Sequence, residues 1–221
     1  MQSMTRQLLL AALMYVAASG VGGACGSAVQ PTPTGDGWIA LFDGKTLDGW
    51  RASEKPGTFR VEDGHIVVEG PRSHLFYVGP VENHSFTNFE WKADVMTMPK
   101  ANSGMYFHTE YLESGWPSKG YEVQVNNTHS DPRKTGSLYA IQDVADALPD
   151  NRWFTQHIIV QGKRIVVRLD GRVVVDYTEP DNVERPPDMA GRKLSRGTFA
   201  LQGHDPASKV LFRNIMVKPL P

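Results

Sequence analysis

The sequence predicts an all-β protein, a two-sheet β-sandwich of the jelly-roll kind. Short runs of alternating apolar and polar residues are separated by turn dipeptides such as Asp63-Gly64 and Asp170-Gly171. The 221 residues include 21 Gly and 15 Pro, and aromatic residues are spread along the whole chain. Closely spaced strands with almost no helical periodicity are typical of sandwiches and barrels rather than of helical or α/β folds.

Length and charge limit the organisation and the partners. A hydrophobic fraction of 40% over 221 residues is enough for one full-sized core, and we find no internal repeat and no second domain. The net charge of -1 argues against nucleic acid as the main partner, because phosphate binding needs a basic excess or stripe.

Residues 1–24 are expected to be a secretory signal peptide. Arg6 precedes a short apolar run over residues 8–18, and small residues follow it. Cys25, the single cysteine, stands at the end of this segment, which resembles a bacterial lipoprotein signal and implies lipidation of Cys25, although Gly22 replaces the usual Leu-like residue.

The alternative is cleavage near Ala24, which would leave a free thiol on a soluble secreted protein. We favour the lipoprotein because an unpaired cysteine is a liability in an oxidising compartment. Either way the protein is expected to be exported, to the periplasm or cell envelope, with residues 25–36 as a flexible tether and residues 37–221 as the domain.

The first part of the domain is expected to supply core packing and two strand regions. Trp38, Phe42 and Trp50 flank turn dipeptides and are interpreted as core and end-cap residues. Residues 59–69 predict a hairpin that turns at Asp63-Gly64. Residues 86–95 alternate strongly, with the apolar side chains on one face of a strand.

The domain is organised around residues 102–126, where two alternating runs flank a connector rich in turn residues. Met105 and Phe107 share one face of the first run, and Tyr121, Val123 and Val125 share one face of the second. If these faces enter the core, the opposite faces bring an imidazole, an acid and an amide together on one sheet surface: His108, Glu122 and Gln124. Such a set suits sugar binding or acid/base chemistry, so we interpret it as the floor of a cleft.

The remaining chain continues the strand pattern. Residues 127–134 form a polar loop, residues 143–148 could form one helical turn, and residues 179–193 are an excursion rich in Pro and charge. Strands are expected at residues 153–160, 163–169, 172–177, 197–204 and 210–215.

An ordered set of motifs resembles the 3-keto-disaccharide hydrolase family of exported bacterial domains. It comprises residues 41–50 (Leu-Phe-Asp-Gly-Lys-Thr-Leu-Asp-Gly-Trp), 102–104 (Asn-Ser-Gly), 120–124 (Gly-Tyr-Glu-Val-Gln), Thr135-Gly136 with Tyr139, Leu201-Gln202 with His204, and 212–215 (Phe-Arg-Asn-Ile). The resemblance covers about residues 37–218. One departure is Phe154, which follows Trp153 where the family commonly has Asn.

The resemblance implies a concanavalin A-like (laminarinase or LamG type) jelly roll and cleavage of glycosides whose glucose unit carries a ketone at C3. That ketone acidifies the hydrogen on C2, so elimination of the C1 substituent followed by hydration would give net hydrolysis. Glu122 or His108 could be the base, and Gln124, Asn102 or a divalent cation could polarise the ketone. His204 could protonate the leaving group.

Other residues are candidates for substrate binding, namely Tyr106, Trp116, Arg133, Tyr139 and Gln202. Trp116 lies in an exposed connector and could stack on a sugar ring, whereas loop charges such as Arg133 are often only solvated. His129 is interpreted as a surface residue. No close-spaced ligand pattern of zinc or calcium type is present, so a bound metal stays an open alternative.

Two other functions compete with this enzyme. The same sandwich hosts non-catalytic carbohydrate-binding modules, because fold alone does not decide function. An ordinary retaining glycosidase needs two neighbouring carboxylates, but Gln124 and Asn126 follow Glu122 at the period-2 positions. The family chemistry also presupposes a partner sugar 3-dehydrogenase that supplies the keto sugar, although the sequence leaves that partner open. The sequence shows no nicotinamide-binding motif with which the chain could make the keto sugar itself.

Overall fold

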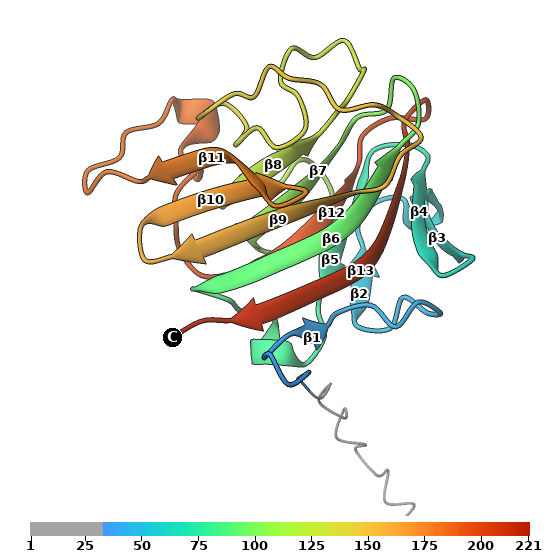
Figure 1. Ribbon diagram of the computed structural model, residues 1–221, viewed down its shortest axis with the longest axis horizontal. Helices are drawn as coiled ribbons and strands as arrows, with labels where there is room; N and C mark the ends of the chain where they lie inside the picture. Colours follow the sequence, from blue (N-terminus) through green and yellow to red (C-terminus); the bar gives the residue numbers. More distant parts are fainter. Residues whose placement is uncertain (1–32) are drawn as a thin grey trace, which may run out of the picture.

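The computed structural model describes residues 33–221 and consists of two antiparallel sheets packed face to face (Figure 1). The larger, eight-stranded sheet has the order β11-β10-β9-β6-β13-β4-β3, with β1 added beside β13, and the smaller, five-stranded sheet has the order β2-β5-β12-β7-β8. This architecture confirms the predicted all-β sandwich. It also confirms that the helices in this part of the chain are short, namely η1 (Pro56–Thr58), η2 (Val81–His84) and η3 (Pro187–Met189).

The strands have the following bounds. The eight-stranded sheet contains β1 (Ile39–Ala40), β3 (Phe59–Glu62), β4 (His65–Glu69), β6 (Phe89–Thr97), β9 (Phe154–Gln161), β10 (Arg164–Leu169), β11 (Arg172–Thr178) and β13 (Lys209–Pro219). The five-stranded sheet contains β2 (Trp50–Ala52), β5 (Ser73–Tyr77), β7 (Ser103–Thr109), β8 (Tyr121–Val125) and β12 (Thr198–Gly203).

The core lies between the inner faces of the two sheets. Along β6, alternate side chains are buried, as its alternating sequence predicts. Trp91 of β6 stacks on Phe199 of β12, with ring centroids 4.4 Å apart, and so joins one sheet to the other. Met105, Phe107 and Tyr121 also enter this core, which confirms the predicted apolar faces of the central strands.

The predicted hairpin turns are present. Asp63 and Gly64 have φ angles of 47° and 80°, as a two-residue turn that follows the strand twist requires, and they connect β3 to β4. Asp170 and Gly171, with φ angles of 48° and 82°, connect β10 to β11 in the same way.

The prediction of a helical turn at residues 143–148 is wrong. The backbone N–H of Val144 donates to Ser137 Oγ at 2.8 Å, and its carbonyl accepts from the N–H of Lys134 at 3.1 Å. Because these backbone groups are used by the neighbouring loop, residues 143–148 form no helical turn and have no regular secondary structure.

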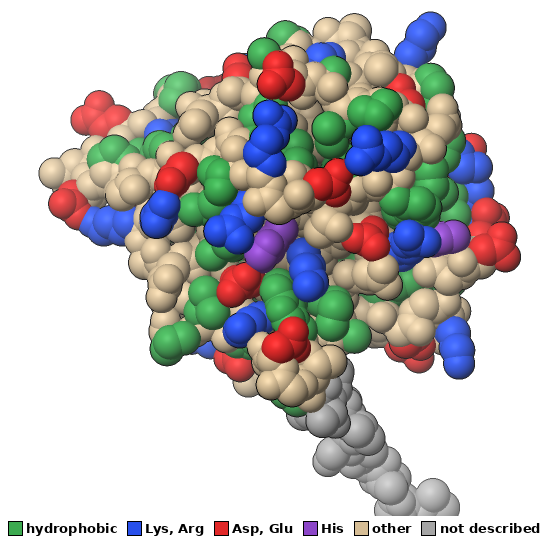
Figure 2. Space-filling view, viewed as in Figure 1, with side chains coloured by type: hydrophobic (Ala, Val, Ile, Leu, Met, Phe, Trp, Pro, Cys, Tyr) green, Lys and Arg blue, Asp and Glu red, His purple; other side chains and the backbone are tan. Residues whose placement is uncertain are grey.

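The outer face of the larger sheet carries acidic and basic side chains interspersed with one another (Figure 2). No helix within residues 33–221 is long and apolar enough to cross a membrane. The expected signal peptide and Cys25 lie outside the described residues.

Candidate functional site

A pocket of about 220 Å³ opens on the outer face of the five-stranded sheet. Its floor consists of side chains from β7, β8 and β12 and from the residue before β7: Tyr106, Glu122, Gln124, Gln202 and Asn102. Its walls come from the surrounding connections: Trp116, Asp131, Tyr139, Arg192 and His204. Pockets that enclose drug-sized ligands measure ~300–1,000 Å³, so this one suits a single ring with the rest of the ligand outside.

The pairing of β7 with β8 assembles the floor. Tyr106 lies opposite Glu122, and Gly104 lies opposite Gln124, so these residues share one face of the sheet. A Cβ atom on Gly104 would come within 2.4 Å of Glu122 Oε1. Glycine is therefore needed there because the carboxylate of Glu122 lies over the bare backbone.

Glu122 is a buried carboxylate with two close partners. Its side chain accepts a hydrogen bond from Gln202 Nε2 at 2.9 Å and lies 3.5 Å from Arg192 Nη2, and the residue is only 4% exposed. Burial raises the pKa of Glu122, and the positive charge of Arg192 opposes that rise. Burial also raises the pKa of Tyr106, whose hydroxyl accepts from Gln202 Nε2 at 2.8 Å.

Arg192 is held in place by a second arginine. Arg185 Nε donates to the backbone carbonyl of Arg192 at 2.8 Å, and Arg185 Nη2 donates to the hydroxyls of Tyr121 and Tyr177 at 2.9 and 2.8 Å. The N–H of Arg192 donates to the carbonyl of Met189 at 2.8 Å. These bonds fix the backbone that carries the Arg192 guanidinium to Glu122.

Three polar atoms of the pocket residues have no hydrogen-bond partner within the described chain. They are Gln124 Oε1, Gln202 Oε1 and Arg192 Nη1, and all three are buried. Buried polar atoms are almost always satisfied in folded proteins. Two acceptors and a cationic donor at one pocket are therefore suited to a ligand that carries several hydroxyl or carbonyl groups.

His204 is oriented by an acidic neighbour at the edge of the pocket. Its Nδ1 lies 2.7 Å from Asp205 Oδ2, which also accepts from Ser208 Oγ at 2.7 Å. Burial tends to raise the pKa of Asp205, but the hydrogen bonds from His204 and Ser208 outweigh it and lower that pKa. A carboxylate that holds Nδ1 leaves Nε2 for proton transfer.

The structure does not bring His108 into the pocket, so its expected place beside Glu122 and Gln124 is wrong. His108 has a φ of 55°, a left-handed conformation that ends the alternation of β7. Its Nε2 is 2.9 Å from the carbonyl of Thr87, and its Nδ1 accepts from the N–H of Ser195 at 3.2 Å. Burial lowers its pKa to about 4. Both ring nitrogens therefore serve the packing of connecting segments.

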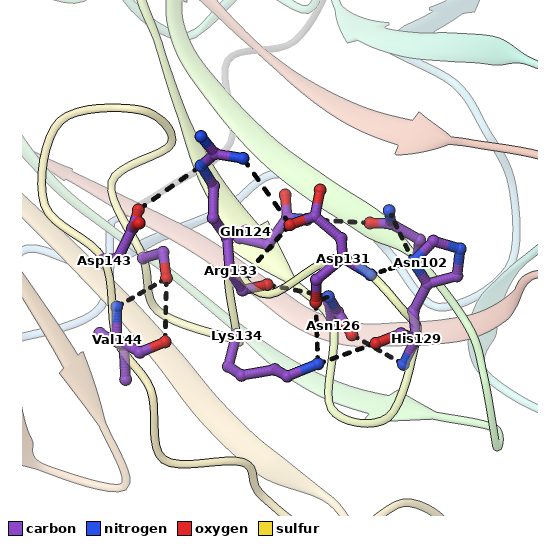
Figure 3. Close-up of polar contacts among 10 residues, drawn as sticks. Asn102, Gln124, Asn126, His129, Asp131, Arg133, Lys134, Asp143 and Val144 are labelled. Carbon is purple, nitrogen blue, oxygen red and sulfur yellow. Dashed lines mark hydrogen bonds and ion pairs between the residues drawn. The ribbon is translucent and has the colours of Figure 1, made fainter.

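The loop 127–134 is folded tightly against the floor (Figure 3). Asn126 Nδ2 donates to the carbonyls of Asp131 and Arg133 at 3.0 and 2.8 Å, and Lys134 Nζ donates to the carbonyls of His129 and Asp131, each at 2.8 Å. These bonds place Asp131 in the pocket wall.

The structure corrects two predictions about residues of this loop. Arg133 does not line the pocket, because its guanidinium lies near Asp131 and Asp143, at 3.8 and 3.5 Å (Figure 3). The guanidinium also lies over the ring of Tyr139. His129 is half-buried rather than a plain surface residue, and its ring lies 5.7 Å from that of His204.

Sequence reasoning missed Arg192, Asp131 and Asp205. Arg192 sits in the excursion over residues 179–193, whose pattern carries no sign of where it folds. Asp205 had a detectable signal, since it directly follows the candidate His204. Within residues 33–221 no group of three or more His, Cys, Asp and Glu side chains is arranged to hold a metal ion.

Comparisons with known proteins find a matching family model and a related protein over most of the chain. A family model described as a 3-keto-alpha-glucoside-1,2-lyase-like domain matches residues 37–218. The chain is 27% identical to a 3-keto-disaccharide hydrolase of Bacteroides thetaiotaomicron, over 84% of this chain and 79% of that protein.

Solved structures share the sandwich at lower identity. A candidate glycosyl hydrolase from Parabacteroides distasonis aligns with a TM-score of 0.71 and 22% identity, over 84% of this chain and 95% of that one. A carbohydrate binding module from Bacillus subtilis aligns with a TM-score of 0.56 and 15% identity, over 77% of this chain and 95% of that one. These two likenesses concern the fold.

Proposed function

The chain belongs to the 3-keto-alpha-glucoside-1,2-lyase-like domain family, and on this basis we propose that it is an enzyme that cleaves 3-keto-glycosides, including 3-keto-disaccharides. The observation that carries the proposal is Glu122, a buried carboxylate of raised pKa on the floor of a pocket whose other groups suit a polyhydroxylated ring. The 3-keto-disaccharide hydrolase that resembles this chain is consistent with that substrate class.

The reaction begins at C2 of the keto sugar. Glu122 removes the proton from C2, and the electron pair forms an enolate whose oxygen is that of the C3 ketone. Arg192 Nη1, which has no partner among the described residues, donates to that oxygen and stabilises its charge. The position of His108 outside the pocket supports Glu122, rather than His108, as the base.

The leaving group departs in the second step. The enolate re-forms the ketone, a double bond forms between C1 and C2, and the bond from C1 to the glycosidic oxygen breaks. His204, held by Asp205, delivers a proton to that oxygen. Water then adds at C1 and C2, which makes the overall change a hydrolysis. Gln124 and Gln202 accept hydrogen bonds from sugar hydroxyls through their unpartnered amide oxygens.

The test compares a 3-keto-glucoside with its unoxidised parent, with and without a chelator, by following release of the leaving group. We expect release from the keto substrate alone. Release from the parent glucoside at a similar rate would overturn the proposal in favour of an ordinary glycosidase. A loss of activity on chelation would add a metal ion to the mechanism.

A non-catalytic carbohydrate-binding module is the second candidate, favoured by the shared sandwich of the Bacillus subtilis binding module and by amide oxygens that suit hydroxyl groups. Glu122→Gln separates the two. An enzyme loses turnover in this variant while ligand binding, measured by calorimetry, persists. A binding module shows no turnover in the wild type either.

We extend the proposal to the location of the protein and to its functional partner. Residues 1–24 direct export and Cys25 becomes the lipidated N-terminus, so the domain acts at the cell envelope beside a sugar 3-dehydrogenase that makes the keto substrate. Fractionation of cells that express Cys25→Ser tests the anchor: the variant moves from the membrane to the soluble fraction. A wild type that is already soluble would contradict it.

A further inference from the structure

Trp116 is an exposed aromatic residue that is nevertheless held in a defined position. It is 45% exposed, yet its ring lies 5.5 Å from the ring of His74, 5.4 Å from that of His204 and 5.3 Å from the guanidinium carbon of Arg72. The preceding residue, Gly115, donates its N–H to Glu54 Oε1 at 3.4 Å. Single exposed apolar residues are ordinary. Trp116 differs because its neighbours hold the ring in the pocket wall, so the exposed part of the ring is already in position to contact a ligand.

The position of His204 indicates which part of the substrate faces Trp116. His204 touches Trp116 and lines the same pocket, and in the proposed reaction it protonates the glycosidic oxygen. The keto sugar occupies the floor around Glu122, and a pocket of about 220 Å³ has no room for a second ring. The group on the far side of the glycosidic oxygen must therefore leave the floor past His204, where Trp116 lies.

The neighbours of Trp116 define the chemistry that fits there. Arg72 binds Glu54 through two contacts, Nε to Oε1 at 2.8 Å and Nη2 to Oε2 at 3.1 Å, so the pair has no net charge. His74 beside the ring is neutral, because burial lowers its pKa to about 3. An aromatic surface beside a balanced ion pair and a neutral imidazole suits a flat-sided, hydroxylated ring rather than an anionic group.

We propose that Trp116, with Arg72 and Glu54 beside it, is the binding site for the leaving group and selects 3-keto-glycosides whose leaving group is a second, neutral sugar ring. This inference rests on the proposed function, and it adds the side of the substrate that is not oxidised.

The test measures kcat/KM for a 3-keto-disaccharide and for methyl 3-keto-glucoside with the wild type, Trp116→Ala and Trp116→Phe. We expect Trp116→Ala to lower the disaccharide value about tenfold, the loss of one stacking contact, and to leave the methyl glycoside value within about twofold. Trp116→Phe keeps a ring and should retain most of the preference. Val173→Ala, at the other exposed large hydrophobic residue in the described chain, should change neither value.

Equal losses on both substrates, or no loss on either, would overturn the leaving-group site. If the wild type cleaves neither keto substrate, the proposed function fails, and the site is then tested by calorimetric binding of the unoxidised disaccharide and methyl glucoside. Tighter binding of the disaccharide that Trp116→Ala abolishes would support the site. Equal binding of the two sugars would overturn it.

Discussion

Glu122 has the environment that a base for a carbon acid needs. An ordinary carboxylate, with a pKa of about 4.3, is too weak to remove a C–H proton efficiently near neutral pH. Burial raises the pKa of Glu122, which would make its carboxylate a stronger base, and the positive charge of Arg192 opposes that rise. In the proposed reaction the same guanidinium also stabilises the negative charge that the proton transfer creates on the sugar oxygen.

Arg192→Met should move the pH dependence of the reaction in a defined direction. The charge of Arg192 lowers the pKa of Glu122 against the effect of burial, so removing it raises that pKa further. In the proposed reaction Glu122 acts as the base only when it is ionised, and the rising limb of kcat/KM against pH should therefore shift to higher pH. The maximum should also fall by about 10²-fold or more because a donor to the developing oxyanion is lost.

Arg164→Met is the matched control for this experiment. Arg164 forms an exposed ion pair with Asp176 on β10 and β11, and such pairs contribute little to stability. In Arg164→Met the rising limb of kcat/KM should stay at the pH of the wild type, and the maximum of kcat/KM should not change. A rising limb that stays in place in Arg192→Met would show that Glu122 is not the group that titrates.

At individual residues, alternation was a sound guide only where the strand stayed regular. Glu122 and Gln124 share the predicted face because β8 alternates over its full length. His108 does not lie on that face. The alternation of the sequence continues through it, but its left-handed φ of 55° turns the chain at this residue. Arg192 could not be found from the pattern at all, since its position depends on Arg185, Tyr121 and Tyr177 meeting in space.

Among the elements, the two connections that carry Trp116 and Arg192 are joined by direct backbone contact. The N–H of Gly120 donates to the carbonyl of Gly191 at 2.9 Å. A Cβ atom on Gly191 would come within 2.1 Å of the carbonyl oxygen of Ser118, so only glycine permits this approach. The connection that carries Trp116 and the connection that carries Arg192 are thus fixed relative to each other.

Gly191→Ala should therefore damage activity more than stability. The added methyl group forces the two connections apart and displaces Arg192, the next residue, from Glu122. We expect kcat/KM to fall at least tenfold while Tm changes by only a few degrees, since displacement of a surface connection removes little of the core. Enzyme assays and thermal unfolding measure the two effects.

Gly57→Ala is the control for this change. A Cβ atom on Gly57 meets no atom within 4 Å, and the residue lies in η1 and does not line the pocket. Activity in Gly57→Ala should be that of the wild type. Full activity in Gly191→Ala as well would mean that the contact between the connections does not position Arg192.

For the molecule as a whole, the sequence contained the class of fold but not the arrangement of its strands. Local signals were sufficient for the hairpins, because the turn residues and the strands they join are neighbours in the chain. The insertion of β13 between β6 and β4, and of β12 between β5 and β7, depends on long-range burial that no local pattern encodes. The composition of the pocket is equally hard to predict, since Gln202 lies beside Glu122 only because β12 takes this place in the sheet.

The same long-range packing buries two neutral histidines, and this predicts how the whole domain responds to acid. Burial lowers the pKa of His74 to about 3 and that of His108 to about 4, whereas in the unfolded chain each has a pKa of about 6.5. Below pH ~6.5 the unfolded chain therefore binds protons that the folded protein does not, so each histidine lowers the free energy of unfolding as pH falls, by at most ~1.4 kcal/mol per pH unit. Protonation of His108 at Nδ1 would also remove the acceptor for the N–H of Ser195.

Urea unfolding between pH 5 and 7.5 measures this dependence, in a range where most carboxylates remain ionised in both states. His108→Gln and His74→Phe should each reduce the steepness of the fall, whatever their effect on stability at pH 7.5, and the double variant should be the least steep of the three. Burial lowers the pKa of His157 as well, so that histidine leaves a residual slope in the double variant. The slope is the decisive quantity, because a purely structural loss would lower the free energy of unfolding equally at every pH. A wild-type slope retained in both variants would mean that neither histidine is kept neutral by the packing of this sandwich.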